Sequence, residues 1–356
     1  MSSPPPRIAI LGCGAVAEIR YLPALAKLKI KPTLLVDRDV QRAQRLADAY
    51  GCVRASDDYR PWVDEFDAAI VALPHSLHAP VSVDLLQRGV HVLVEKPMAL
   101  TTTECDQLIA AASEQKAILA VGLMRRHAPA ARWLKAALDA RALGPIESFD
   151  FQEGIPYAWP VVSGFFFDKT AAGGGVLADT GAHTLDLLLW WLGDVASFEY
   201  YDDAYGGVEA DALLRVTLAS GARGVVELSR TRQLRNTAVL RGRDGEIEIG
   251  LDKKNKNSLA ARPKAVLSVR SGRVRGTRMR RLKTDDLFRL QIEDWLRAIE
   301  SGRSPLVPPE EGARSVALIE ACYRERRLLE LPWIRPADAQ LPRLHHGHFS
   351  QLPDST

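Results

Sequence analysis

Three residues of this chain have the types and the sequence context needed to move a proton. Lys96 follows the apolar, strand-like run 91–94, and Asp179 and His183 stand four residues apart in an apolar stretch that opens with three glycines. A separation of four residues places two side chains on the same face of an α-helix. A histidine next to a carboxylate suits a general base, and an ammonium group stabilises a developing alkoxide. Lys96, Asp179 and His183 are therefore the candidate catalytic residues.

Each candidate also has a purely structural interpretation. Lys96 could form a surface ion pair with its neighbour Glu95, and Asp179 with His183 could be a structural pair. The catalytic interpretation gains weight only if the same chain also binds a cofactor, because neither residue pair is specific by itself. The first third of the chain contains such a cofactor motif.

The pattern GxGxxA spans residues 12–17, between an apolar run and a helical stretch. In a dinucleotide-binding turn Gly12 makes the bend, Gly14 lets the backbone approach the pyrophosphate, and the helix start offers free N–H groups. Asp37 closes the next apolar run, at the spacing of an acid that binds the adenosine ribose. The sequence thus predicts that a nicotinamide dinucleotide contacts Gly12, Gly14, Ala15, Val16 and Asp37.

Asp37 and its neighbour indicate which dinucleotide this is. A carboxylate accepts hydrogen bonds from a free 2′-hydroxyl and repels a 2′-phosphate. Arg38 could stack on the adenine or bind a phosphate, or it could be a solvated loop residue. NAD is therefore favoured, with NADP as the alternative.

The elements around these motifs differ between the two parts of the chain. Uniformly apolar runs predict the buried strands of a doubly wound parallel α/β sheet, at 7–11, 33–36, 68–72, 91–94 and 118–121. Helical spacing separates them, at 15–27, 40–50, 79–88 and 101–115, and Thr101 with Glu104 forms a capping box.

Beyond a helix at 128–143, longer alternating strands predict an α+β domain with a large, mostly antiparallel open sheet. The strands are expected at 147–152, 198–201, 210–218, 223–228, 237–241, 246–249, 266–269 and 273–282, covered by helices at 176–192, 285–300 and 310–329. The predicted division is a dinucleotide-binding domain over 1–124, a substrate-binding and oligomerisation domain over 125–330, and a tail over 331–356.

Four motifs occur together in the order typical of one known family: GxGxxA at 12–17, ALPHSLH at 72–78, EKP at 95–97 and GGGxxxDxGxHxxD at 173–186. With them the chain resembles the Gfo/Idh/MocA oxidoreductases, from residue 7 to about 329. The resemblance implies an N-terminal Rossmann domain, a C-terminal domain with an open sheet, and assembly into dimers or tetramers.

The resemblance also implies roles for individual residues. Lys96 would hydrogen-bond the reacting hydroxyl, Asp179 would orient the substrate and Lys96, and His183 would take the proton while a hydride passes to the nicotinamide. The cofactor lining would include Arg38, Pro74, His75, His78, Glu95 and Lys96, with His75 in place of the family's more usual asparagine.

Members of this family commonly act on a sugar, a cyclitol or a nucleotide-sugar, so we expect hydride transfer between such a hydroxyl or ketone and NAD(P). Two other functions stay open: an NAD-dependent glycosidase that oxidises its sugar transiently, and a redox-silent protein that binds NAD and a sugar. Near the domain junction, Arg125 could contact the substrate or form a salt bridge. Tyr157 and Trp159 could stack on a sugar face or pack a lid.

Positive charge is concentrated in one segment. The net charge is only +3, yet the run from Lys253 to Lys283 contains no acidic residue, and Arg230, Arg232 and Arg235 precede it. An anionic sugar-like substrate, acids of a neighbouring subunit, or water could face this charge. No nucleic-acid motif accompanies it, so nucleic acid is not an expected partner.

Length and composition limit the remaining function classes. The chain has 356 residues, 47% of them apolar, and four scattered cysteines, which suits free thiols in a cytoplasmic protein. Neither a secretory leader nor a membrane-spanning run is recognisable, so no membrane partner is expected. A metal site is not expected either, because the histidines at 345, 346 and 348 read as solvated tail residues.

Overall fold

The computed structural model describes residues 5–251, 258–261 and 284–329. Its first sheet has six parallel strands in the order β3-β2-β1-β4-β5-β6, which confirms the predicted doubly wound architecture. The strands are β1 (Ile8–Leu11), β2 (Leu34–Val36), β3 (Arg54–Ser56), β4 (Ala68–Val71), β5 (His91–Val94) and β6 (Leu119–Val121). The edge strand β3 was not predicted, because its Arg-Ala-Ser sequence has no apolar pattern.

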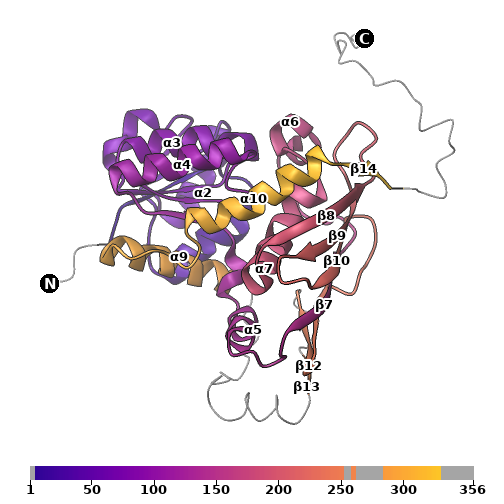
Figure 1. Ribbon diagram of the computed structural model, residues 1–356. Helices are drawn as coiled ribbons and strands as arrows, with labels where there is room; N and C mark the ends of the chain where they lie inside the picture. Colours follow the sequence, from indigo (N-terminus) through magenta and orange to yellow (C-terminus); the bar gives the residue numbers. More distant parts are fainter. Residues whose placement is uncertain (1–4, 252–257, 262–283, 330–356) are drawn as a thin grey trace, which may run out of the picture.

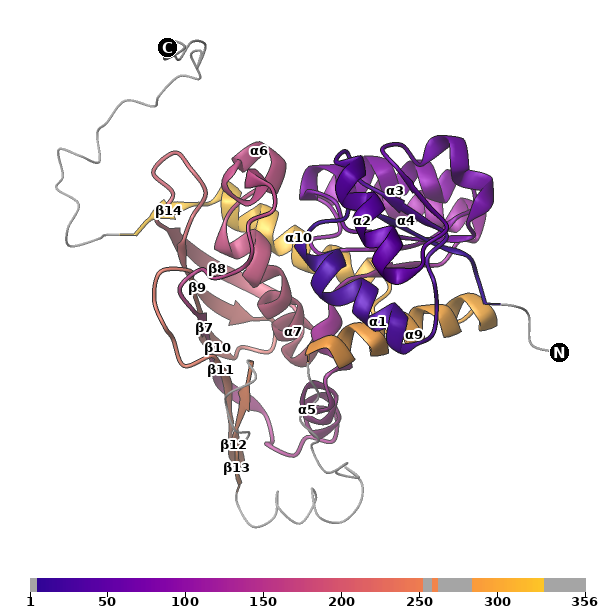
Figure 2. The ribbon, with the colours of Figure 1, turned by 180° about the vertical axis from the view of Figure 1, so that it is seen from behind.

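Helices cover both faces of this sheet (Figure 1; Figure 2). They are the π-helical η1 (Ala17–Tyr21) with α1 (Leu22–Lys27), α2 (Val40–Tyr50), α3 (His78–Gln87) and α4 (Thr102–Gln115). The predicted capping box at the start of α4 is present, since Thr101 and Glu104 satisfy each other's backbone N–H groups. A short 3-10 helix, η2 (Arg60–Glu65), links β3 to β4.

The strand order brings three chain segments to one edge of the sheet. β1 pairs with β2 on one side and with β4 on the other, and β4 pairs with β5. The connections that leave the carboxyl ends of β1, β4 and β5 therefore lie side by side, at the point where open α/β sheets bind ligands. These connections carry the glycine turn, His75 and Lys96.

The second sheet has eight strands in the order β13-β12-β11-β7-β10-β9-β8-β14. Most neighbours are antiparallel, as predicted, but β7 pairs in parallel with β10 and β8 with β14. The strands are β7 (Ile146–Gly154), β8 (Val195–Asp202), β9 (Asp211–Leu218), β10 (Arg223–Ser229), β11 (Thr237–Gly242), β12 (Gly245–Gly250), β13 (Ser258–Ala261) and β14 (Arg327–Leu328). The strands predicted at 266–269 and 273–282 lie outside the described residues.

One face of the second sheet packs against helices. These are α5 (Pro129–Asp139) and the continuous helix made of the π-helical η6 (Leu177–Gly181) and α7 (Ala182–Leu192). The short α6 (Lys169–Ala172) instead contacts the 3-10 segments His75–Leu77 and Gly164–Phe167. Leu185 and Leu188 of α7 belong to the core that Phe151 and Leu214 form from the sheet side. Short 3-10 helices occur at η3 (His75–Leu77), η4 (Met124–His127) and η5 (Gly164–Phe167).

The two helices near the C-terminus connect the halves of the molecule. We predicted that the helix at 285–300 packs on the second sheet, and this is wrong. Phe288, Ile292 and Trp295 of α9 (Thr284–Ser301) belong to the core around β1 and α1, where Figure 1 shows α9 beneath the first sheet. The spacing of these apolar residues predicts an amphipathic helix, but it does not show which domain the helix packs against. α10 (Pro309–Arg324) contacts both α4 and α7.

Candidate active site

A cavity of roughly 440 Å³ lies where the carboxyl edge of the first sheet meets the helix η6–α7 and the second sheet. Both halves of the chain contribute to its walls. From the first come Gly14, Ala15, Val16, His75, His78, Glu95 and Lys96, and from the second Arg125, Glu153, Tyr157, Asp179, His183 and Arg230. The segments that carry the predicted cofactor and catalytic residues therefore share one cavity, although they span more than 200 residues of sequence.

The glycine turn has the shape that a dinucleotide requires. Gly12 has a φ of +98°, and a Cβ there would overlap the Ala72 carbonyl, so only glycine fits. A Cβ at Gly14 would meet nothing within 4 Å, and Gly14 lines the cavity. The backbone at this position thus faces open space at a helix start, which is where a pyrophosphate could approach. The residues present fit NAD.

Asp37 supports the same turn from the end of β2. Its carboxylate accepts hydrogen bonds from the backbone N–H of Cys13 (2.8 Å) and of Asp39 (2.9 Å). Arg38 is exposed, and neither residue lines the cavity itself. A carboxylate fixed beside the glycine turn is suited to a ribose hydroxyl and opposes a phosphate.

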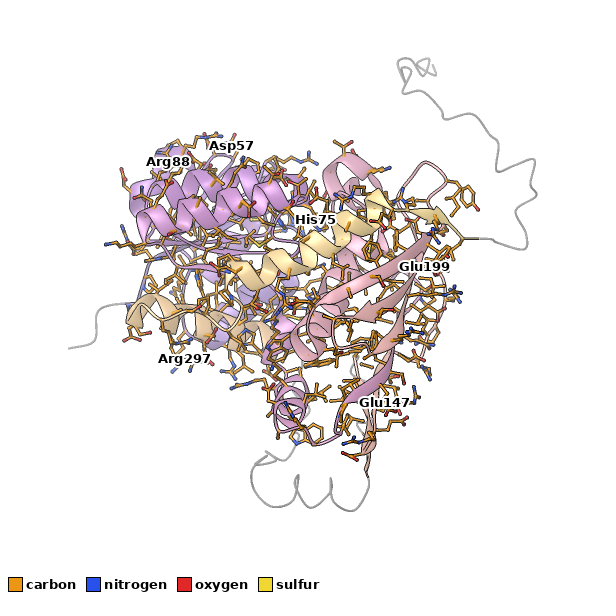
Figure 3. The ribbon with its side chains drawn as sticks, viewed as in Figure 1. Asp57, His75, Arg88, Glu147, Glu199 and Arg297 are labelled. Carbon is orange, nitrogen blue, oxygen red and sulfur yellow. The ribbon has the colours of Figure 1, made fainter. Side chains whose placement is uncertain are left out.

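Replacing this carboxylate should change cofactor preference. In Asp37→Ser the ratio of kcat/KM for NADP to that for NAD is expected to rise by about tenfold, because the like-charge repulsion of a 2′-phosphate disappears. Steady-state kinetics with both cofactors measure it. The exposed Asp57, labelled in Figure 3, provides the matched control Asp57→Ser, which should leave the ratio unchanged. An unchanged ratio in Asp37→Ser would show that Asp37 does not discriminate.

Lys96 and Asp179 form an ion pair across the cavity. The Lys96 ammonium contacts the Asp179 carboxylate and also donates to the Asp179 backbone oxygen at 3.0 Å. Arg230, at the end of β10, donates to the other carboxylate oxygen at 2.7 Å. Burial acts to raise the pKa of Asp179, but Lys96 and Arg230 outweigh it and hold that pKa well below its usual range. Asp179 is therefore ionised and fixes the position of both cations.

His183 lies one helical turn beyond Asp179 and is nine-tenths buried. Its Nδ1 atom is buried and has no hydrogen-bond partner within the described part of the chain. Burial, followed by the charges of Arg125 and Lys96, lowers the pKa of His183 well below 6.5. The imidazole is thus neutral at physiological pH, and a neutral imidazole is the form that accepts a proton.

A buried glutamate holds the start of the helix that carries these residues. Glu209 accepts hydrogen bonds from the backbone N–H groups of Gly175 (2.8 Å) and Leu177 (3.0 Å), and from the Tyr323 hydroxyl (2.7 Å). A Cβ at Gly175 would overlap the Glu209 backbone, which explains the glycine at this position of the motif. We did not predict Glu209, because the contact joins segments more than 30 residues apart and has no local signal.

The two histidines after β4 make backbone contacts. His75 donates from Nδ1 to the Ala172 carbonyl (2.8 Å), and both ring nitrogens of His78 face carbonyl oxygens, of Pro97 (2.7 Å) and Leu73 (2.8 Å). Burial lowers the pKa of His75 to about 3 and that of His78 to about 4. His78 thus has no ring nitrogen left for a ligand. Pro74 precedes η3 and does not line the cavity.

Glu95 and Arg125 are also held by side-chain partners. Glu95 accepts from the Tyr21 hydroxyl at 2.6 Å, and burial raises its pKa. Arg125 donates two hydrogen bonds to Glu153 (2.7 and 2.5 Å), and Thr184 of α7 donates to the same carboxylate at 2.7 Å. Arg125 therefore forms the salt bridge that we considered, and it lines the cavity as well.

Aromatic side chains of the segment 155–167 form the outer wall of the cavity. The Tyr157 ring lies 5.3 Å from the Arg230 guanidinium carbon, and the Trp159 ring lies 5.7 Å from that of Arg20. Phe165 and Phe166, which we did not predict, contact the His75 ring edge-on, and Figure 3 shows His75 at the junction of the two halves. Flat apolar faces beside charged groups suit the binding of a sugar ring.

Two of the three arginines predicted to face an anion lie elsewhere. Arg232 pairs with Asp211 and Glu227, Arg235 pairs with Asp150, and about half of each side chain is exposed. Only Arg230 lines the cavity. All three arginines follow β10 in the loop that leads to β11, rather than standing on a strand pair as predicted, so no regular alternation relates their directions. The run from Lys253 to Lys283 falls almost entirely outside the described residues.

Within the described ranges, no group of histidine, cysteine and acidic residues is arranged to hold a metal ion, and no helix is long and apolar enough to cross a membrane. The histidines at 345, 346 and 348 lie outside these ranges.

Curated proteins similar to this chain include reductases and dehydrogenases of sugars and cyclitols. The dTDP-3,4-didehydro-2,6-dideoxy-alpha-D-glucose 3-reductase of Actinomadura kijaniata is 27% identical over 337 residues, which cover 92% of this chain and 98% of that protein. The scyllo-inositol 2-dehydrogenase (NAD(+)) of Bacillus subtilis is 26% identical, with 85% of this chain and 88% of that protein covered.

Solved structures share the fold. The WlbA dehydrogenase of Bordetella pertussis, in complex with NADH and UDP-GlcNAcA, superposes with a TM-score of 0.77 at 20% identity and covers 90% of this chain and 95% of that one. The aldose-aldose oxidoreductase of Caulobacter crescentus superposes with a TM-score of 0.74 at 23% identity and covers 89% and 96%.

Two family models match consecutive parts of the chain and together span most of it. Residues 6–123 match the oxidoreductase family with an NAD-binding Rossmann fold, and residues 131–248 match the GFO/IDH/MocA C-terminal domain. These matches include the glycine turn, Lys96, Asp179 and His183. The chain belongs to the Gfo/Idh/MocA oxidoreductase family.

Proposed function

We propose that this protein is an NAD-dependent oxidoreductase that interconverts a hydroxyl and a ketone of a sugar, a cyclitol or a nucleotide-sugar. The observation that carries the proposal is the ion pair of Lys96 and Asp179, which lies with the neutral His183 in the same cavity as the glycine turn. The named activities of similar proteins support the substrate class.

The proposed reaction divides between these side chains. When bound at the glycine turn, NAD supplies the acceptor of the hydride. The Lys96 ammonium donates a hydrogen bond to the reacting oxygen and stabilises its negative charge, while Asp179 holds the lysine in place. His183 accepts the hydroxyl proton, for which its unpartnered Nδ1 or its other ring nitrogen is available. In the reverse direction His183 returns the proton.

The low pKa of His183 predicts the pH dependence of the oxidation. Only the neutral imidazole accepts a proton, and this form is lost only as the pH falls below the pKa of His183, which lies well below 6.5. We therefore expect protonation of His183 to leave log kcat/KM unchanged down to pH 6.5 and to lower it only at more acidic pH. A fall in kcat/KM with a midpoint at or above pH 6.5 that disappears in His183→Ala would contradict the lowered pKa of His183.

The function is tested by screening substrates. Full-length protein with NAD is offered a panel of aldoses, inositols, uronic acids and nucleotide-sugars, and NADH absorbance is followed. Saturable NADH formation with at least one of them is the expected result, with His183→Ala strongly impaired on the same compound. If NADH binds but no member of these classes is oxidised, and no corresponding ketone is reduced, the proposed substrate class is wrong.

A second candidate function has the same residues. An NAD-dependent glycosidase would oxidise its sugar transiently and return the hydride, so it would cleave a glycoside without net formation of NADH. A redox-silent NAD and sugar-binding protein would do neither. The joint presence of Lys96, Asp179 and His183 in one cavity favours catalysis over the silent alternative.

Arg230 makes an anionic substrate part of the proposal. Of Arg230, Arg232 and Arg235, only Arg230 lines the cavity. Two cations, Lys96 and Arg230, pair with the single carboxylate of Asp179, so this cluster carries one net positive charge. An acidic sugar or a nucleotide-sugar would suit this positive charge. The KM of such a substrate should therefore rise more in Arg230→Gln than the KM of a neutral sugar does.

We infer a cytoplasmic homo-oligomer, a dimer or tetramer, and the domain division at residues 124/125 and 330/331. The last strand of the first sheet, β6, ends at Val121, and the first strand of the second, β7, begins at Ile146, which supports the first boundary. Light scattering of the purified chain measures the oligomeric state.

A further inference from the structure

A second cavity, of roughly 1030 Å³, lies among α5, the end of α7, α9 and the start of α10. We call it the arginine groove, because Arg126, Arg132, Arg297, Arg303 and Arg314 line it. It shares no lining residue with the cavity of the candidate active site. Neither the proposed reaction nor the NAD-binding turn uses it.

Most cations of the arginine groove are neutralised by acids. Arg303 pairs with Asp294 (2.6 Å), Arg314 with Asp194 (2.8 Å), and Arg126 with Asp186 (2.6 Å). Lys135, one turn from Arg132, pairs with Asp139 at 2.5 Å. The positive charge of these four cations is therefore largely cancelled by their acidic partners.

Arg132 of α5 and Arg297 of α9 differ from the others. Among residues 5–251, 258–261 and 284–329, neither makes an ion pair or a side-chain hydrogen bond, and both are exposed. Arg297 is labelled at the surface of α9 in Figure 3. Two unpaired guanidinium groups on the walls of one cavity provide up to ten N–H donors for an oxyanion.

His127 provides a second, independent feature of the groove. It lines the cavity and is 7% exposed, yet its ring has no hydrogen-bond partner in the described part of the chain. Burial lowers its pKa to about 4, with Asp294 opposing and Arg132 and Arg297 reinforcing the shift. His127 is therefore a neutral ring with one N–H to donate.

We infer that the arginine groove binds a phosphate-type oxyanion between Arg132 and Arg297, with the His127 ring as a further donor. Guanidinium groups bind phosphate oxygens in pairs, and the N–H of the His127 ring, which lines the groove, can donate to an acceptor that enters it. The same chemistry is found in free polyphosphate and in a phosphorylated sugar.

Calorimetric titration of the full chain tests this inference. The protein is first saturated with NADH, so that the glycine turn, where a pyrophosphate could also bind, is filled. The buffer contains about 0.15 M NaCl, which screens non-specific attraction between charges. Inorganic pyrophosphate and glucose 6-phosphate are titrated separately. Saturable binding of at least one is expected, and the tighter of the two identifies the source of the oxyanion.

Two double variants decide where the anion binds. Arg132→Gln with Arg297→Gln should weaken binding by about tenfold or more, since both charge-assisted contacts are lost. Arg45→Gln with Arg324→Gln removes the same charge at two exposed arginines outside the groove and should leave the affinity unchanged. Absence of saturable binding to the NADH-loaded protein overturns the inference. So does an affinity that the Arg132→Gln and Arg297→Gln pair weakens no more than the control pair does, because the anion then binds elsewhere, for example beside Arg230.

Discussion

Lys96→Met is expected to lower kcat by about a thousandfold or more while the dissociation constant of NADH changes little. The methionine keeps most of the side-chain volume but removes the charge that stabilises the reacting oxygen, and this charge matters most in the transition state. We expect the glycine turn and Asp37 to hold NADH, and the substitution touches neither of them. Turnover of the best substrate and fluorescence titration of NADH measure the two quantities separately.

The control for this prediction is Lys31→Met, which makes the same substitution at an exposed lysine away from the cavity and should retain full turnover. Normal turnover in Lys96→Met would remove the lysine from the mechanism. A parallel loss of NADH affinity would instead make Lys96 a cofactor-binding residue.

The second large effect concerns stability. Arg126→Met should lower the free energy of unfolding by about 3–5 kcal/mol, because it leaves the carboxylate of Asp186 buried without its partner. Arg126 and Asp186 are almost completely buried and share three hydrogen bonds of 2.6 to 3.0 Å, and Arg126 also reaches Glu311 on α10 at 3.0 Å. Denaturant unfolding of the purified variants gives the free energies.

Two comparisons separate this effect from a general sensitivity to arginine loss. Arg88→Met breaks the exposed pair with Asp84 and should cost less than about 1 kcal/mol. Arg126→Met combined with Asp186→Leu removes both charges and should regain much of the lost stability. A free energy for Arg126→Met within about 1 kcal/mol of the wild type would contradict the role of this pair.

The fold was predictable where the chain repeats a local pattern. The central strands β1, β4 and β5 are uniformly apolar, and the capping box marks the start of α4. β3 was missed because an edge strand needs no apolar face. The position of α9 was missed because an amphipathic stripe shows that a helix is buried but not against which domain.

The site was predictable where a motif fixes the chemistry of its residues. Gly12, Lys96, Asp179 and His183 stand in such motifs, and the structure brings their segments to one cavity. Arg230 and Glu209 could not be assigned in this way. Glu209 precedes β9 and Arg230 follows β10. Their contacts, with the start of η6 and with Asp179, join segments far apart in the sequence and leave no local signal.

One isotope experiment tests hydride transfer assisted by Lys96 most directly. The best substrate of the screen is prepared with deuterium at the carbon that is oxidised and is incubated with the protein and NAD. We predict one deuterium in the reduced cofactor for each ketone formed, with transfer slowed by about a thousandfold or more in Lys96→Met. If the sugar is converted but no deuterated NADH accumulates, hydride transfer to NAD is not the reaction of this protein.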